Sequence, residues 1–199
     1  MPKRAPAATI TGVNVYLRPP RLSDAVAFHA AVRASAALHR GWTSAPRTPA
    51  RYAKFVQRYA TRGKLPTQAG YLVFRREDDA LVGVYNFSEI VRGAFQSAFL
   101  GYFAFAPLAG KGLMAEGLAA ALDIAFRQLK LHRVEVNIQP TNTRSLALAT
   151  RLGFIREGYS RRYVKIGGRW RDHVRFAMLA EDWRLLRRKR RPARKDPDR

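Results

Sequence analysis

The spacing of apolar and polar residues divides the chain into strands and helices. Alternation of apolar and polar positions predicts strands, and recurrence at intervals of three and four residues predicts helices. By this rule we expect strands over residues 13–18, 71–76, 81–90, 96–106, 132–139, 159–166 and 170–179. The three strands between residues 71 and 106 follow one another with short connections, which is typical of an antiparallel meander.

Four helices are expected between these strands, over residues 23–38, 49–62, 112–129 and 145–151. Ser23 and Thr48 are suitable N-caps for the first two, and Pro49 suits the first helical position. Gly153 closes the last helix. The resulting order is β-α-α-β-β-β-α-β-α-β-β.

The length and composition limit the chain to one domain and show a strong positive charge. The 199 residues are 47% apolar, which is enough for one domain, and we assign it to residues 1–183. The formal net charge is +23. Residues 184–199 hold nine Lys or Arg against two Asp, so we expect a basic, disordered tail there.

The charge allows two interpretations. It favours acidic partners such as RNA, a ribosome surface or nucleotide phosphates. Alternatively, with 29 Arg against 8 Lys, it reflects an arginine-rich proteome.

Several classes of protein are disfavoured by the composition. The chain has no cysteine, so it has no disulfide framework, no thiolate nucleophile and no cysteine-based zinc site. None of its four histidines are spaced as ligand pairs, and we expect no metal. The uncharged, apolar run over residues 97–110 is shorter than the roughly 20 residues of a membrane helix. We therefore expect a cytoplasmic protein without a membrane partner.

A glycine-rich loop precedes the third predicted helix. Gly110, Gly112 and Ala115 fit the dinucleotide pattern G-x-G-x-x-(G/A), and Glu135 follows twenty residues after Ala115. A dinucleotide fold, however, needs this loop directly after the first strand of a parallel sheet. Here antiparallel strands precede the loop, and Glu135 lies in the middle of a strand. The loop also lacks the spacing of a phosphate-binding P-loop.

The physical properties of this loop are independent of that pattern. The first turn of a helix has unpaired N–H donors and a partial positive charge. Small residues before the helix leave these donors uncovered, and Lys111 adds a positive charge. The loop is therefore a candidate anion site, with an ordinary strand-to-helix turn as the alternative.

Four longer segments carry a resemblance to a known family. They are GVYNFSEIVRGAF (83–95), LGYFAFAPLAGKGLMAEGL (100–118), HRVEVNIQPTNTRSLALATRLGFIREGY (132–159) and WRDHVRFAMLAEDW (170–183). With the element order, they resemble the GCN5-related N-acetyltransferases (GNAT), and within them the ribosomal-protein-alanine N-acetyltransferases of the RimJ type. The resemblance covers about residues 13–183. It implies an α/β (α+β) GNAT fold, with a mixed, mostly antiparallel sheet of about seven strands and four helices.

The resemblance implies acetyl-CoA as co-substrate. The strand from Phe103 to Ala106 would pair with the pantetheine arm and supply an oxyanion donor, and the glycine loop would hold the pyrophosphate. The chain departs from the family pattern at Ala109, where Gln or Arg is usual. The cofactor-binding residues implied are Phe103, Ala104, Phe105, Ala106, Gly110, Lys111, Gly112, Leu113, Met114, Ala115 and Asn142.

The resemblance also implies catalytic and acceptor residues. Ser145 corresponds to the serine proposed to protonate the leaving thiolate, and we place Glu89 as a general base acting through water. Asn142 and Ser145 have an alternative role as helix-capping residues. Glu116, in the first turn of a helix, is expected to be structural. The candidate acceptor-binding residues, each with packing as the alternative, are Trp42, Phe87, Arg92 and Tyr163.

The function implied is transfer of an acetyl group to the N-terminal alanine of a ribosomal protein. One alternative keeps the acetyl-CoA site and changes the acceptor to another protein N-terminus, a polyamine or an antibiotic amine. Another is a ribosome- or RNA-binding factor with a secondary or inactive acetyl site, which the basic surface and tail suggest.

Overall fold

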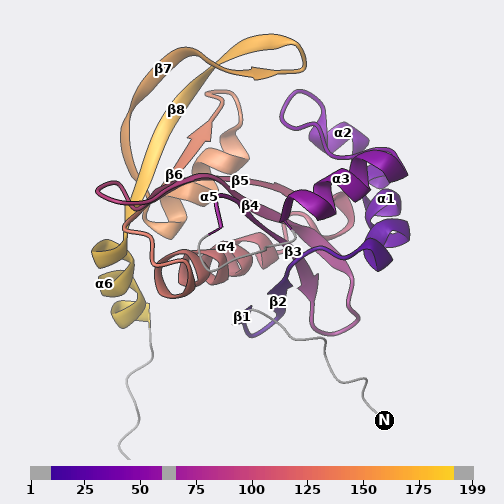
Figure 1. Ribbon diagram of the computed structural model, residues 1–199, viewed down its shortest axis with the longest axis horizontal. Helices are drawn as coiled ribbons and strands as arrows, with labels where there is room; N and C mark the ends of the chain where they lie inside the picture. Colours follow the sequence, from indigo (N-terminus) through magenta and orange to yellow (C-terminus); the bar gives the residue numbers. More distant parts are fainter. Residues whose placement is uncertain (1–9, 60–65, 191–199) are drawn as a thin grey trace, which may run out of the picture.

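The computed structural model describes residues 10–59 and 66–190, in which the strands join in one sheet (Figure 1). The strand order is β1-β2-β3-β4-β5-β6-β8-β7. Only β5 and β6 pair in parallel, and every other neighbouring pair is antiparallel. The strands are β1 (Ile10–Thr11), β2 (Val15–Arg18), β3 (Ala69–Arg75), β4 (Leu81–Val91), β5 (Ser97–Ala104), β6 (Arg133–Ile138), β7 (Ile155–Ile166) and β8 (Arg169–Leu179).

The described residues form six α-helices and three further helical segments of other types. The α-helices are α1 (Ala25–Ala34), α2 (Ala36–His39), α3 (Pro49–Tyr59), α4 (Leu113–Asp123), α5 (Thr143–Leu152) and α6 (Ala180–Arg190). The segments η1 (Leu22–Asp24) and η2 (Ala106–Leu108) are 3₁₀ turns, and η3 (Ile124–Gln128) extends α4 as a π-helix.

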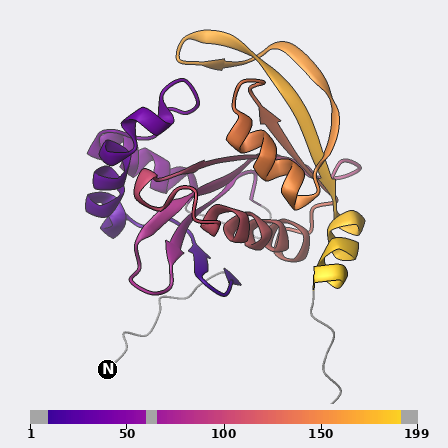
Figure 2. The same cartoon turned by 180° about the vertical axis from the view of Figure 1, so that it is seen from behind.

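The sheet separates two groups of buried side chains. Helices α1 and α3 cover one face, and Figures 1 and 2 show α4 against the other. Phe28 of α1 packs in a cluster with Leu72 of β3, whereas Val73 of β3 joins Leu118 of α4 in the second cluster. Successive side chains of a strand point to opposite faces. Strand β3 therefore contributes to both layers, which explains its nearly continuous apolar sequence.

The sheet opens between its two parallel strands. Pairing of β5 with β6 is confined to Ser97–Phe99 and Arg133–Glu135. Beyond these residues both strands continue, β5 to Ala104 and β6 to Ile138, without pairing to each other. The strand ends therefore separate and leave a gap in the sheet in which a ligand can lie.

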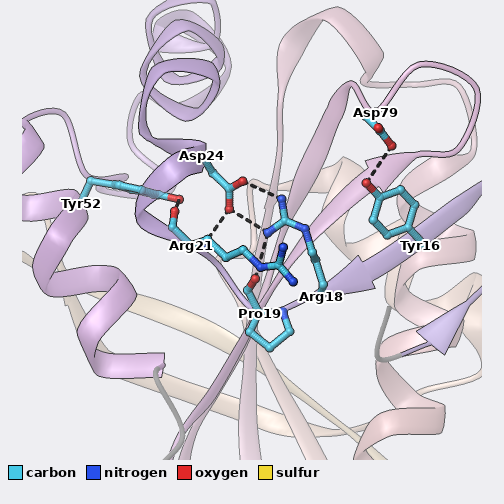
Figure 3. Close-up of polar contacts among 7 residues, drawn as sticks. All are labelled: Tyr16, Arg18, Pro19, Arg21, Asp24, Tyr52 and Asp79. Carbon is cyan, nitrogen blue, oxygen red and sulfur yellow. Dashed lines mark hydrogen bonds and ion pairs between the residues drawn. The ribbon is translucent and has the colours of Figure 1, made fainter. Parts of the chain in front are cut away.

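A buried ion pair fixes the chain where it leaves β2 (Figure 3). The Arg18 guanidinium donates to both carboxylate oxygens of Asp24, at 2.8 and 2.6 Å, and also lies over the ring of Phe74. Asp24 also accepts a hydrogen bond from the backbone N–H of Arg21 at 2.8 Å. The network thereby sets the direction in which α1 leaves the sheet, and α1 leads to one wall of the gap.

The fold class predicted from the sequence is confirmed, and so are the seven predicted strands. The eighth strand, β1, is only two residues long. The prediction of four helices was too low. The first predicted helix is divided at Ser35, whose hydroxyl donates to the Ala31 carbonyl and accepts from the Ala106 N–H, and α6 was not predicted.

The C-terminal boundary predicted at residue 183 does not coincide with the end of an element. Helix α6 continues through Arg190, so residues 184–190 are helical rather than disordered. Residues 191–199, the rest of the predicted tail, lie outside the described residues, as does the predicted end of the second helix at residues 60–62. The assignment of one domain to residues 1–183 stays a prediction.

Candidate active site

The gap between β5 and β6 forms a cleft of about 920 Å³. Residues 100–104 of β5 line one side, and residues 136–139, at and just past the end of β6, line the other. The glycine loop before α4, the start of α5 and the segment after α2 close it. The Gln139 side chain donates to the Gly41 carbonyl at 2.9 Å, which ties the end of β6 to the segment after α2.

The glycine loop presents uncovered backbone donors at one end of the cleft. Gly110 and Gly112 have φ angles of 80° and 79°, which favour glycine, and a Cβ atom built at either would meet nothing within 4 Å. In the part of the chain that the structure describes, no protein group accepts a hydrogen bond from the N–H groups of residues 110–114. The loop therefore has the donors and the open space that an anion needs.

The predicted loop residues differ in how they reach the cleft. Gly110, Gly112, Met114 and Ala115 line it. The Leu113 side chain is buried in the core and does not line it, because it lies on the face of α4 that packs on the sheet. The exposed Lys111 is also outside the lining. Its contact with a phosphate stays a prediction.

Only half of the predicted strand segment 103–106 reaches the cleft. Phe103 and Ala104 line it, whereas Phe105 is fully buried and its N–H donates to the Val82 carbonyl. The N–H of Ala106 already donates to Ser35 Oγ at 2.8 Å. The structure therefore does not bring Phe105 and Ala106 to the cleft, because the chain turns into η2 there.

The hydrogen bond from the Phe105 N–H to the Val82 carbonyl identifies which backbone groups of β5 face the gap. In an antiparallel ladder, alternate residues bond to the partner strand. Since the Phe105 N–H bonds to β4, the N–H groups of Tyr102 and Ala104 point to the other edge, toward the gap. The Ala104 carbonyl, on this edge as well, accepts a hydrogen bond from His39 Nε2 at 2.8 Å.

Ser145 and Asn142 meet in the first turn of α5. Asn142 is the N-cap, and its Oδ1 accepts from the Ser145 N–H at 3.2 Å, so the capping alternative is confirmed for Asn142. The Ser145 hydroxyl has another partner, because it donates to Tyr102 Oη at 2.8 Å. Burial raises the pKa of Tyr102 to about 12, so its hydroxyl keeps its proton at neutral pH.

The cleft lining also includes residues that were not predicted from the sequence, among them the four polar residues His39, Asn86, Tyr102 and His173. His39 and His173 are buried, and desolvation lowers the pKa of each, which favours the neutral imidazole. His173 Nδ1 donates to the Arg171 carbonyl, which leaves Nε2 as the acceptor nitrogen. The adjacent motifs "LGYF" and "WRDH" were available signals for two of the four.

Asn137 also lines the cleft. Its Oδ1 is buried and finds no hydrogen-bond partner among the described residues. A buried carbonyl oxygen without a partner is uncommon in folded proteins.

Three residues that were predicted as site residues on or near β4 do not line the cleft. Phe87 is fully buried in the core, because its neighbour Asn86 takes the cleft side of the strand. Arg92 lies past the strand end and donates to the Leu129 carbonyl at 2.5 Å. Glu89 has a φ of 49° at a bulge in β4 and is exposed outside the cleft lining. The bulge interrupts the alternation of faces along β4, so Glu89 does not follow Asn86 toward the cleft.

The remaining predicted residues are placed as follows. Trp42 lines the cleft, and Tyr163 lies on the hairpin beside it, with its ring 6.2 Å from that of His173. Glu116 accepts from the backbone N–H groups of Asn14 and Val15, which confirms its structural role between α4 and β2.

Two further classes of site were searched for in residues 10–59 and 66–190. No group of three or more His, Asp or Glu side chains is arranged to hold a metal ion there. No helix there is both long and apolar enough to cross a membrane.

Comparison with known proteins identifies the class to which this fold and cleft belong. The family model "Acetyltransferase (GNAT) domain" matches residues 14–155. The chain therefore belongs to the GNAT family, and the protein is an N-acetyltransferase.

Two sequence relatives and one solved structure show which members of the family this chain resembles. The [ribosomal protein uS5]-alanine N-acetyltransferase of Escherichia coli is 44% identical over 111 residues, which are 56% of this chain and 57% of that enzyme. Bacillus subtilis "Probable N-acetyltransferase YjcK" is 39% identical over 65% of this chain and 71% of its own. Mycobacterium smegmatis RimJ, solved with CoA-disulfide, superposes with a TM-score of 0.77 at 28% identity, covering 88% of this chain and 90% of its own. The resemblance to the RimJ type is confirmed.

Proposed function

We propose that the protein transfers an acetyl group from acetyl-CoA to the N-terminal amine, with alanine as first residue, of a ribosomal protein. The observation that carries the proposal is the cleft between β5 and β6, which joins the free donors of the glycine loop to the Ser145 hydroxyl. The 44% identity to an enzyme that acts on ribosomal protein uS5 supports the acceptor. The reaction would take place in the cytoplasm, where ribosomal proteins are made.

The donors in the cleft fit acetyl-CoA. The N–H groups of residues 110–114 suit its pyrophosphate, because they are uncovered and begin a helix. The free edge of β5, with the Tyr102 and Ala104 N–H groups, suits the amide groups of the pantetheine arm. When bound, acetyl-CoA supplies an activated thioester.

The residues near the free edge of β5 would then act on that thioester. The Ala104 N–H, on the edge of β5 that faces the gap, would stabilise the negative charge that develops on the carbonyl oxygen. His39 holds the Ala104 peptide in place through its carbonyl. Ser145, whose hydroxyl proton is directed at Tyr102 Oη in the structure, would turn that proton to the sulfur as the carbon–sulfur bond breaks and would then regain a proton from water.

The acceptor amine needs little help to lose its proton. A free α-amine has a pKa of about 7.7–8.0, so a useful fraction is neutral at pH 7. Its nitrogen bonds to the carbonyl carbon and releases a proton to water. Positioning alone can supply roughly 7–11 kcal/mol of the barrier. This explains how the reaction can proceed with Glu89 exposed outside the cleft lining.

A polyamine or other small cationic amine is a less suitable acceptor. A protein with a net charge of +23 repels free cations. The same charge suits a protein that visits ribosomes, and contact with RNA through the basic surface and tail is part of the proposal.

The test is turnover of acetyl-CoA with a panel of acceptors: peptides beginning with Ala, Ser, Thr or Met, then spermidine and an aminoglycoside. We expect the Ala peptide to give the highest kcat/KM. Rapid turnover with a small amine and none with the Ala or Ser peptides would refute the acceptor. A thermal-shift comparison tests the cofactor, since acetyl-CoA should raise the Tm and NADH should not.

A further inference from the structure

The hairpin formed by β7 and β8 carries a basic and aromatic surface beside the cleft. Figure 1 shows it arching away from the rest of the sheet, on the side where α2 lies. Residues 155–179 contain seven Lys or Arg and two acidic residues. Five of these cations are exposed: Arg156, Arg161, Arg162, Lys165 and Arg169.

These cations are available to a partner. Among the described residues, none of the five makes an ion pair. The two acidic residues of the hairpin already have partners within the protein. Glu157 pairs with Arg133, and Asp172 accepts from the Tyr159 hydroxyl and the Arg162 N–H. Glu157 is thus neutralised by Arg133, whereas Asp172 keeps its charge and offsets one of the five positive charges of the surface.

Large aromatic side chains are exposed among the cations. Trp170 is 60% exposed, Tyr159 48% and Tyr163 38%. A tryptophan left so exposed keeps a large apolar surface in water, which is unfavourable unless a partner covers it.

The strand register separates the two faces of the hairpin. Ile166 and His173 line the cleft. Since successive residues of a strand face opposite sides, Lys165 lies on the face turned away from the cleft. Its cross-strand partner is Trp170, which shares that face. The cation and the aromatic ring thus lie side by side on the outer face, while the inner face belongs to the acetyl-transfer site.

We propose that the outer face of the β7–β8 hairpin binds single-stranded RNA. Cations interleaved with exposed aromatic rings match its chemistry, because phosphates pair with Lys and Arg while unstacked bases stack on aromatic and guanidinium planes. An acidic peptide would use the charges and leave the aromatic rings uncovered. RNA bound there would hold an acceptor protein that is itself bound to RNA at the mouth of the cleft. The inference does not depend on the identity of the acceptor.

The experiment measures binding of a fluorescein-labelled 12-nucleotide single-stranded RNA of mixed sequence to the full chain by anisotropy, at several salt concentrations. One variant carries Arg161→Gln, Arg162→Gln and Lys165→Gln. The matched control carries Arg51→Gln, Lys54→Gln and Arg58→Gln on the exposed side of α3, which removes the same charge elsewhere. Each lost phosphate contact should reduce the slope of log K against log salt by about 0.7.

We expect the hairpin variant to bind at least 10-fold more weakly with a slope reduced by about 2, and the α3 variant to change less than 2-fold. Trp170→Ala should weaken binding by about 5- to 100-fold, the range for one stacked base, and Trp170→Phe should restore most of it. Unchanged Tm and unchanged turnover of an Ala peptide in these variants would separate this result from loss of folding or of acetyl transfer.

Three outcomes would overturn the inference. Equal losses in the two triple variants would mean that only total charge matters. Unchanged RNA binding in both the hairpin variant and Trp170→Ala would remove the hairpin from the interface. Binding of a poly-glutamate peptide as tightly as RNA, with the same dependence on the hairpin, would identify an acidic protein partner instead.

Discussion

Replacing Gly112 with alanine separates the glycine loop's role in folding from its role in binding. Gly112 has a φ of 79° and lines the cleft, and a Cβ built on it meets nothing within 4 Å. The methyl group therefore fits the folded protein without a clash. It would occupy the open space beside the free N–H groups that we assign to the pyrophosphate.

The expected cost to folding is small. A non-glycine residue in the left-handed region costs about 1–2 kcal/mol. For a chain of this size each kcal/mol lowers the Tm by about 2–4 °C, so we expect a fall of about 2–8 °C. Gly93 provides the matched control, because it also has a positive φ, 67°, and open space around a built Cβ, but does not line the cleft. Gly93→Ala should lower the Tm by a similar amount.

The expected cost to binding is larger. Displacing the phosphate from one N–H group loses a hydrogen bond to a charged partner, worth about 1.5–3 kcal/mol. The KM for acetyl-CoA should rise roughly 10- to 150-fold in Gly112→Ala and stay within twofold in Gly93→Ala. The kcat should change little, because the phosphate contacts are the same in the ground state and the transition state.

The assay follows release of the CoA thiol during acetylation of an Ala peptide, and calorimetry gives the Kd for CoA. The reasoning is refuted if Gly112→Ala is folded, shows the expected fall in Tm and still binds CoA as wild type does. Gly110→Ala, with a φ of 80° and the same open space, serves as a second test if Gly112→Ala does not fold.

Four further changes test other parts of the structure. Asp24→Asn should destabilise the protein by about 3–5 kcal/mol in thermal melts, because it leaves the buried Arg18 without its counter-charge; adding Arg18→Met should recover most of this. Ser145→Ala should lower kcat by about 10²-fold or more with little change in KM, and an unchanged kcat would remove it as the proton donor. Glu89→Gln should leave kcat within threefold, since the side chain is exposed outside the cleft lining, and a large loss would restore it as a base. Burial lowers the pKa of His39 in the folded state, so its contribution to stability is complete above about pH 6.5 and is lost as pH falls through the folded pKa; His39→Gln should flatten the fall of Tm between pH 7 and pH 5.

Local signals were sufficient to predict seven of the strands and a glycine loop suited to an anion. Alternating residues predicted seven strands, because the side-chain period of a strand is a property of the chain itself. The glycine loop before α4 could be found for a similar reason, since a positive φ and unpaired N–H groups at a helix start depend on a few neighbouring residues. The N-cap role of Asn142 is local in the same sense.

Which residues line the cleft depends on the tertiary structure and not on local sequence. Strand β4 is buried on both faces, so its sequence could not show that Asn86 faces the cleft while Phe87 faces the core. The bulge at Glu89 depends on the register with β5, and a shift of one residue exchanges the faces. For these reasons two residues predicted on β4 were misplaced, although the strand itself was correct.

What the sequence by itself determined about this protein is therefore the order of its seven longer strands and part of its helices, its positive charge and a loop suited to an anion. Only the tertiary structure decided that β5 and β6 pair over three residues and then separate, because pairing between strands about 30 residues apart depends on everything packed around them. That separation brings His39, Tyr102 and Ser145 to one cleft from three distant segments. A chemical site of this kind requires groups to meet in space, and spacing along the chain carries little information about which of them do.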